Sequence, residues 1–222
     1  MKHVLMTGGS SGIGKALRET LLQMGYKVTN ISRSEGEILC DLSNTKTLEC
    51  EVKKWLKTNE VDVLINCAGV GVFEPHESIN VSKIKEIIDI NLCAPIILSN
   101  LCLRSLKKTK GHIFNVTSIE ATKHSKFSAL YTATKSGLRD FGLCLFEEIR
   151  KDEVKVTSLN PDMTKTPFFD SLHFEPSSKS NEHLLPQTLA NTMKFILENE
   201  AVITDITIRA PKFGITKKKN SL

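Results

Sequence analysis

The sequence has no strong excess of charge, no paired cysteines and no long uninterrupted apolar run. The formal net charge of its 222 residues is +5, and three of those charges come from Lys217, Lys218 and Lys219. The rest of the chain is therefore only weakly basic, which excludes the profile typical of nucleic-acid-binding proteins. A mild positive balance still suits an anionic cofactor.

The six cysteines show no Cys-x-x-Cys pair and no regular spacing. Most of them lie in apolar runs, where a free cysteine behaves as a small hydrophobic side chain. This distribution argues against a disulfide scaffold and favours a reducing compartment, so we expect a cytoplasmic protein. We expect no metal site.

The sequence shows no run of about 18 apolar residues, and so predicts no membrane-spanning helix. The first predicted strand begins at Lys2, which leaves no room for a signal peptide. We therefore expect neither a membrane nor a nucleic acid among the partners.

The composition that remains is that of one ordinary globular domain, with 40% apolar and 25% charged residues. A domain of this length buries roughly 70–75% of the surface of its unfolded chain. No repeat or linker divides the sequence. We expect a single domain over 1–210 and a flexible basic tail over 211–222.

Short apolar runs alternate with helical patterns along the chain. Strands are expected at 2–6, 27–32, 38–41, 61–66, 113–117, 154–159 and 205–208. Helices are expected after the glycine-rich turn that follows the first strand, and at 45–57, 81–107 with a bend at Pro95, 127–150 and 186–199. This alternation predicts an α/β fold in which helices cover both faces of a parallel sheet. The link between Ser34 and Glu37 is too short for a helix, so that crossover should be a loop.

The turn Thr7-Gly-Gly-Ser-Ser-Gly-Ile-Gly14 joins the first strand to a helix. Glycines let the backbone approach a pyrophosphate, and a helix N-terminus offers free N–H groups and a positive dipole end. A tight turn without a ligand is the alternative interpretation. Because ligands of such sheets bind beyond the carboxyl ends of the strands, the polar residues that follow the strands should form one composite site.

The second strand ends at Ser32-Arg33-Ser34 without an acidic residue. At this position of a dinucleotide site an acid selects a free ribose 2′-hydroxyl, whereas an arginine suits a 2′-phosphate. Arg33 therefore favours NADP over NAD, although it could also be a solvated turn residue.

Tyr131 and Lys135 lie four residues apart, on the same side of a predicted helix. An ammonium group beside a phenol makes the ionised phenol easier to reach near neutral pH. Such a pair could pass a proton to a carbonyl oxygen or take one from an alcohol. By itself the spacing also fits a packed tyrosine and an exposed lysine.

Over residues 1–210 the chain resembles the short-chain dehydrogenase/reductases. The resemblance rests on motifs in the family's order: Thr7–Gly14, Asp41, Asn66-Cys-Ala-Gly69, Asn91 in Ile-Asp-Ile-Asn-Leu, Ser118, Tyr131-x-x-x-Lys135 and Asn160-Pro161. It implies a Rossmann-type sheet of seven parallel strands in the order 3-2-1-4-5-6-7, with helices on both faces. It also implies a homodimer or homotetramer that pairs through helices 81–107 and 125–151.

The resemblance implies a role for each motif. Tyr131 would be the general acid/base, Lys135 would lower its pKa and bind the nicotinamide ribose, Ser118 would bind the substrate carbonyl and Asn91 would hold a water of the proton relay. The expected cofactor-binding residues are Gly8, Ser10, Ser11, Ile13, Gly14, Arg33, Asp41, Leu42, Asn66, Ala68, Gly69, Tyr131, Lys135, Pro161, Thr164 and Thr166.

Asp162 departs from the family pattern, because it replaces the usual glycine after the sixth strand and brings a charge beside the nicotinamide. The segment 162–185 contains a cluster of phenylalanines and is expected to be a substrate lid; a surface loop packed on its own side chains is the alternative. Pocket walls are expected from 70–76, 119–130 and 162–185, where Lys123, His124 and Lys126 either meet an anionic group or face water.

Together these features predict an NADP(H)-dependent oxidoreductase that moves a hydride between the nicotinamide and a small carbonyl or alcohol substrate. The alternative is a catalytically silent protein that senses NADP(H) and regulates a partner.

Overall fold

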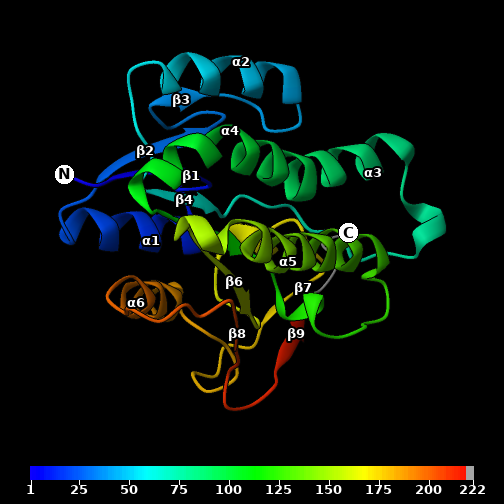
Figure 1. Cartoon of the computed structure of the whole chain (residues 1–222). Coiled ribbons are helices and arrows are strands. Elements are labelled where there is room, and N and C mark those ends of the chain that lie inside the picture. Colours follow the sequence, from blue (N-terminus) through cyan, green and yellow to red (C-terminus); the bar gives the residue numbers. More distant parts are fainter. Residues whose placement is uncertain (219–222) are drawn as a thin grey trace.

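The computed structural model describes residues 1–218, which form a central parallel sheet between two layers of helices (Figure 1). The strands of this sheet are β1 (His3–Thr7), β2 (Lys27–Ser32), β3 (Ile38–Leu39), β4 (Val63–Asn66), β5 (His112–Val116), β6 (Lys155–Pro161) and β8 (Asp205–Ile208). Their order is β3-β2-β1-β4-β5-β6-β8, which confirms the predicted seven-stranded arrangement. The last strand is numbered β8 because β7 (Phe174–Pro176) belongs to a separate small sheet.

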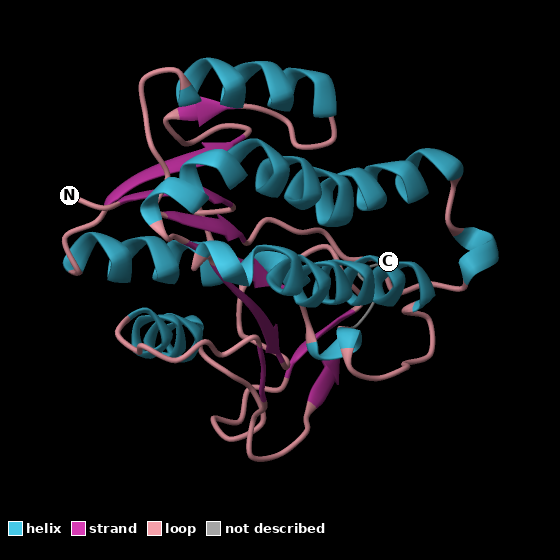
Figure 2. Cartoon of the chain, in the orientation of Figure 1, coloured by secondary structure: helices cyan, strands magenta, loops and turns pink. Residues whose placement is uncertain are grey.

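Helices supply the outer layers on both faces of the sheet (Figure 2). Those on one face are α2 (Thr45–Leu56), α4 (Ala94–Thr109) and α5 (Ala129–Ile149), and those on the other are α1 (Gly12–Gln23) and α6 (Pro186–Leu197). The strands are apolar on both sides, as burial between two layers requires. On β1, for example, Leu5 packs with the first set of helices, whereas Val4 and Met6 pack with the second.

One helical stretch runs from Val81 to Thr109, with its irregularity before Pro95 rather than at it. After α3 (Val81–Ile88), a π-helical turn, η2 (Asp89–Cys93), leads into α4. Pro95 lies in the first turn of α4, where the missing proline N–H costs no helical hydrogen bond.

Contrary to the expectation from sequence, this stretch is long and apolar enough to cross a membrane by length and composition. Half of its most apolar window is buried inside the protein, where Leu98, Cys102 and Leu106 are fully buried. The stretch therefore packs its apolar face against the sheet, as a core helix does.

The predicted loop between β2 and β3 is confirmed. Parallel neighbours ordinarily need a long crossover, but β3 pairs only with the last two residues of β2, through Ile31 with Ile38 and Ser32 with Leu39. The chain therefore turns back over a short distance. Gly36 allows this turn, since a Cβ there would lie 2.5 Å from the carbonyl oxygen of Asn30.

The chain after β8 differs from the expected free tail. Strand β9 (Ile215–Lys217) pairs antiparallel with β7, and the two lie side by side beneath the main sheet in Figure 1. The tail therefore packs on the segment 162–185 at least as far as Lys218. The rest of the expected tail, 219–222, lies outside the described residues.

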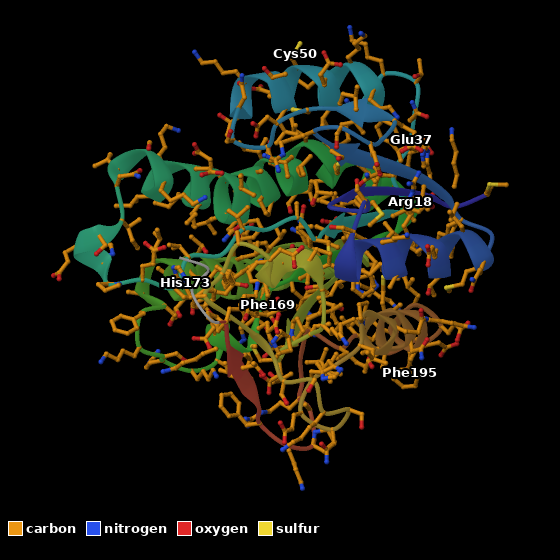
Figure 3. All side chains as sticks on the ribbon, turned by 180° about the vertical axis from the view of Figure 1, so that it is seen from behind. Arg18, Glu37, Cys50, Phe169, His173 and Phe195 are labelled. Atoms are coloured by element: carbon orange, nitrogen blue, oxygen red, sulfur yellow. The ribbon has the colours of Figure 1, made fainter. Side chains whose placement is uncertain are left out.

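Phe114 in the centre of β5 tests how much of the stability comes from the sheet core. It is completely buried and its ring stacks on His112, with centroids 4.0 Å apart. We expect Phe114→Ala to lower the free energy of unfolding by about 3–5 kcal/mol in urea titrations, because it removes a ring and leaves a cavity. Phe195→Ala, on the outer side of α6 with Phe195 57% exposed (Figure 3), should change it by less than about 0.5 kcal/mol. Equal losses would contradict this account of the core.

Candidate functional site

A cavity of about 780 Å³ opens at the carboxyl ends of the sheet strands. Its walls come from the segments that follow β1 to β6 and from the segments around β7 and β9. Among the predicted site residues, those that line it are Gly8, Ser10, Ser11, Ile13, Gly14, Arg33, Asp41, Leu42, Ala68, Gly69, Ser118, Tyr131, Lys135, Pro161, Thr164 and Thr166. The structure thus brings together residues that lie far apart in the sequence.

The turn after β1 is a cradle of bare backbone. Gly8 has a φ of 73°, and a Cβ there would lie 2.8 Å from the backbone nitrogen of Ala68. A Cβ on Gly14 would lie 1.9 Å from the carbonyl oxygen of Gly8, so no side chain fits. Thr7 fixes the neighbouring strand end, because its Oγ1 accepts hydrogen bonds from the N–H groups of Cys67 and Ala68, both at 3.1 Å.

The N-terminus of α1 faces this cradle with unused hydrogen-bond donors. Ser11 stands at the N-cap, but its side chain makes no capping hydrogen bond, and the first turn holds no acidic residue. The free N–H groups and the positive end of the helix dipole therefore point at the cavity. A diphosphate group fits this arrangement of glycines and donors.

Arg33, Asp41 and Leu42 line the far end of the cavity, where an adenosine would lie. The Asp41 carboxylate accepts hydrogen bonds from the Ser43 N–H at 2.9 Å and the Ser43 hydroxyl at 2.8 Å, which lower its pKa. Arg33 is exposed and has no ion-pair or hydrogen-bond partner among residues 1–218. Its guanidinium is therefore free to bind an anion.

Two acidic residues, Glu35 and Glu37, follow the end of β2, and neither of them lines the cavity. The Glu37 carboxylate accepts a hydrogen bond from the Asn30 N–H at 2.7 Å and pairs with Arg18 at 2.9 Å. Arg18 and Glu37 face each other across α1 and the β2–β3 link (Figure 3). Because Glu37 is engaged in this ion pair, Arg33 is the charged side chain after β2 that lines the cavity where a ribose would bind.

Tyr131 and Lys135 lie one turn apart near the start of α5, and both are more than 90% buried. The Lys135 Nζ donates a hydrogen bond to the carbonyl oxygen of Val116 at 2.9 Å and lies 5.9 Å from the centre of the Tyr131 ring. Ser118 follows β5 on the same wall, and its hydroxyl lies close enough to Tyr131 to lower the pKa of the phenol. Hydroxyl, phenol and ammonium therefore share one wall of the cavity.

Burial dominates the ionisation of this pair. It raises the pKa of Tyr131 above its ordinary value, while the nearby Ser118 hydroxyl acts in the opposite direction. Burial also lowers the pKa of Lys135 from 10.5 to about 8. Loss of solvent is the largest influence on the phenol, and the predicted effect of Lys135 on its acidity stays a prediction.

Asn91 and Asn66 are predicted site residues that do not line the cavity. The Asn91 side chain lies in the π-helical turn, and its amide binds the backbone N–H and carbonyl of Val70, both at 2.9 Å. It thereby fixes the loop that follows β4. Asn66 is buried in the sheet and donates to Asn115 at 2.9 Å. Both side chains therefore support the segments that form the cavity wall without lining the cavity themselves.

Asp162 lines the cavity, but its charge is compensated. Its carboxylate accepts a hydrogen bond from the Met163 N–H at 2.9 Å, and Arg209 approaches it at 3.4 Å. Thr166 reaches the glycine-rich turn, since a Cβ on Gly12 would lie 3.1 Å from the Thr166 side chain. The first part of the segment 162–185 therefore lies against the glycine-rich turn.

The sequence predicted one part of the wall near Tyr131 and missed another. Phe73 and Phe168 place their rings 5.1 and 6.0 Å from the Tyr131 ring, within segments where walls were expected. Phe213, Ile215 and Lys217, from the supposed tail, also line the cavity. Lys123 and Lys126 line it as well, whereas His124 does not.

Residues 1–218 contain no group of three His, Cys, Asp or Glu side chains placed to hold a metal ion. The polar groups of the cavity are the hydroxyls, the lysines and the backbone donors described above. The arrangement suits an organic cofactor with a diphosphate.

Comparison with known proteins shows the same architecture over nearly the whole chain. The model of the short chain dehydrogenase family matches residues 2–175. An uncharacterized oxidoreductase of Staphylococcus epidermidis is 28% identical over 226 aligned residues that cover 94% of this chain and 96% of that protein. A second, from Staphylococcus haemolyticus, is 29% identical, with 92% and 95% covered.

Solved structures agree with these relatives. An alcohol dehydrogenase from the archaeon Thermococcus sibiricus, complexed with 5-hydroxy-NADP, superposes with a TM-score of 0.84 at 25% identity and covers 95% of this chain and 97% of its own. A 4-hydroxyisoleucine dehydrogenase complexed with NADH shares the fold, with a TM-score of 0.82, 24% identity and the same coverage.

The chain therefore belongs to the short-chain dehydrogenase family, as its motifs indicated. It is an oxidoreductase that acts between CH–OH and C=O groups with a nicotinamide cofactor.

The buried Lys135 gives a pH-dependent stability that can be measured without a cofactor. Between pH 8 and 10.5 the unfolded chain holds the Lys135 proton and the folded chain releases it, so unfolding takes up a proton. The contribution of Lys135 to the free energy of unfolding should therefore rise with pH, by at most about 1.4 kcal/mol per unit, whereas the buried thiols of Cys67 and Cys102, whose pKa values are raised to about 12, contribute in the opposite direction. Lys135→Met keeps these thiols and loses the lysine, so we expect the slope of its free energy of unfolding against pH to lie below that of the wild type in urea titrations from about pH 8 to about pH 9.5. The exposed Lys46→Met should keep the slope of the wild type; the same slope in all three proteins would contradict the assigned pKa.

Proposed function

We propose that the protein is an NADP(H)-dependent cytoplasmic enzyme that interconverts a small carbonyl compound and its alcohol, with Tyr131 as the general acid/base. The observation that carries this proposal is the placement of Ser118, Tyr131 and Lys135 on the wall of a cavity that also contains the glycine cradle. The side chains proposed for catalysis and the glycine-rich turn proposed to bind the dinucleotide therefore line the same cavity.

The residues that would hold the cofactor follow from the cavity. The cradle from Gly8 to Gly14 and the free N–H groups of α1 would bind the diphosphate, while Asp41 and Leu42 would contact the adenine. Lys135 would bind the nicotinamide ribose, Thr166 beside Gly12 would close over the cradle, and Thr164 would contact the cofactor from the cavity wall. When bound, the cofactor supplies or accepts a hydride at the carbonyl carbon.

The environment of Tyr131 favours the role of proton donor. Because burial raises the phenol pKa, Tyr131 is protonated at neutral pH and can donate its proton to a carbonyl oxygen that becomes an alkoxide. The Ser118 hydroxyl would donate a second hydrogen bond to the same oxygen and so orient the substrate. In the reverse direction Tyr131 must first lose its proton, which makes alcohol oxidation favoured at high pH.

Arg33 supports a preference for NADP. It is exposed at the adenosine end, it has no partner among residues 1–218, and the nearby Glu37 is engaged with Arg18. A guanidinium in this position suits a phosphate monoester. Solved relatives carry either an NADP derivative or NADH, so the choice depends on residues such as Arg33.

We also propose a homodimer or homotetramer that pairs through α4 and α5. These two helices lie next to each other on one side of the sheet, where they could form a continuous contact surface. Light scattering at micromolar concentration would test this, and a monomer would contradict it.

Replacement of Tyr131 tests its catalytic role. Tyr131→Phe should keep NADPH affinity but lower kcat about 10²–10⁴-fold with a panel of aldehydes, ketones and quinones, because the proton donor is lost. Tyr26→Phe, at the other tyrosine of the chain, should keep wild-type turnover. Undiminished turnover by Tyr131→Phe would remove this residue from the mechanism. NADPH binding by the wild type without turnover of any compound would instead favour the regulatory alternative.

Replacement of Arg33 tests the cofactor preference. Arg33→Ala should weaken NADPH binding about tenfold or more and leave NADH binding nearly unchanged, since one charge-assisted contact to the 2′-phosphate is lost. Arg150 follows the C-terminal end of α5 and does not line the cavity, so Arg150→Ala is the control and should change the affinity for neither cofactor. Calorimetric titration measures both affinities. If Arg33→Ala weakened the binding of NADPH and NADH equally, the proposed role of Arg33 would be contradicted.

A further inference from the structure

The segment 212–218 is hydrogen-bonded to the lid along its whole length. Its backbone contacts join Lys212 N to Asn181 O, Ser177 N to Gly214 O and Lys218 N to His173 O, at 2.9, 3.2 and 2.9 Å. The Lys218 Nζ donates to the carbonyl oxygens of Phe169 and Asp170 at 2.5 and 3.1 Å. Lid and tail therefore form one unit, and Figure 3 shows Phe169 and His173 within it.

Strand β9 turns one of its faces to the cavity. Side chains alternate along a strand, so Ile215 and Lys217 share a face and Thr216 points the other way. Ile215 and Lys217 line the cavity, as does Phe213 just before the strand, whereas Thr216 does not. The segment 212–218 thus supplies one wall of the cavity at the end that contains Tyr131, here called the substrate end.

Between the catalytic phenol and this strand lies an aromatic wall. The Phe73 ring is 5.1 Å from the Tyr131 ring and 5.1 Å from the Phe174 ring. Phe174 is in turn the residue paired with Lys217 in the β7–β9 register. Lys217 is therefore separated from Tyr131 by the span of two aromatic rings, a distance that an apolar molecule with polar groups at both ends can bridge.

The charges around this end do not cancel. Glu120 pairs with Lys123 at 3.2 Å, and Asp162 pairs with Arg209 at 3.4 Å. Lys126 and Lys217 line the same cavity and have no carboxylate partner among residues 1–218. The ammonium of Lys126 lies over the exposed ring of Phe127, 4.8 Å from its centre. The substrate end therefore presents unpaired positive charge at an apolar wall.

We propose that the substrate has an apolar or aromatic body with a carboxylate or similar anion at the end opposite the reacting carbonyl, and that Lys217 on β9 binds this anion with the help of Lys126. The aromatic wall would hold the body of the molecule. This assignment rests on the proposed function, because it places the reacting group at Tyr131. It makes the chain after Ile208 a determinant of specificity.

Two isosteric aldehydes that span two rings test the proposal, 4′-formylbiphenyl-4-carboxylate and the neutral 4′-formylbiphenyl-4-carboxamide, each reduced with NADPH to the corresponding benzylic alcohol. The wild type should prefer the carboxylate by about tenfold or more in kcat/KM, as expected for one charge-assisted contact. Lys217→Gln should lose most of that preference and retain its activity on the amide. Lys212→Gln, a charge-matched change on the same segment outside the cavity lining, should behave as the wild type.

No preference in the wild type, or equal effects of Lys217→Gln and Lys212→Gln, would overturn the proposal. A binding measurement separates it from the proposed function. Calorimetry with the NADP⁺-saturated wild type should show tighter binding of 4′-(hydroxymethyl)biphenyl-4-carboxylate than of the corresponding carboxamide, with the difference lost in Lys217→Gln. This preference in binding, with no turnover of either aldehyde, would keep the anion site and reject the enzymatic role; absence of the preference in binding would overturn the anion site itself.

Discussion

The site depends on a place where segments of backbone come closer together than side chains would allow. The turn after β1 folds back so that Gly14 touches the carbonyl of Gly8, and Gly8 in turn touches the backbone of Ala68. Thr7 ties the strand ends together with two hydrogen bonds to the chain after β4. Any side chain at these glycines would push α1 away from the sheet, and the free donors at its N-terminus would no longer face the cavity.

A second constraint is the exclusion of water around the reactive groups. Tyr131 and Lys135 are both buried. Burial raises the pKa of the phenol and lowers the pKa of the ammonium, so it favours the neutral form of each side chain. The phenol therefore keeps its proton at neutral pH, and the lysine loses its proton at a lower pH than an exposed lysine would. Burial, the helical spacing and the hydrogen bond to Val116 together decide the chemistry of this wall.

Much of this could be predicted from sequence because the signals are local and repeated. Each buried parallel strand is an apolar run, and each is followed by polar or glycine residues, so both the sheet and the edge that carries the site could be inferred. The bounds of β8 at Asp205–Ile208 matched the expectation. The positions of Ser118 and Tyr131 followed from motif spacing.

What sequence could not give depends on distant contacts. A three-residue strand such as β9 has too short a pattern to recognise, and its lysines resemble a solvated tail until β7 is seen beside it. The π-helical turn at Asn91 reflects a tertiary hydrogen bond to Val70, whereas the visible proline suggested a bend elsewhere. The raised pKa of Tyr131 depends on how completely the lid and the loop after β4 cover the ring, which no spacing encodes.

The brevity of β3 has a consequence for solubility. This strand forms one margin of the main sheet and comprises only Ile38 and Leu39, so very few unpaired backbone donors and acceptors are exposed along that margin. Long, flat margins recruit strands from other molecules and seed aggregation. By ending the sheet in a two-residue strand beside a tight, charged turn, the chain can carry a broad parallel sheet without offering a template on that side to a neighbouring molecule.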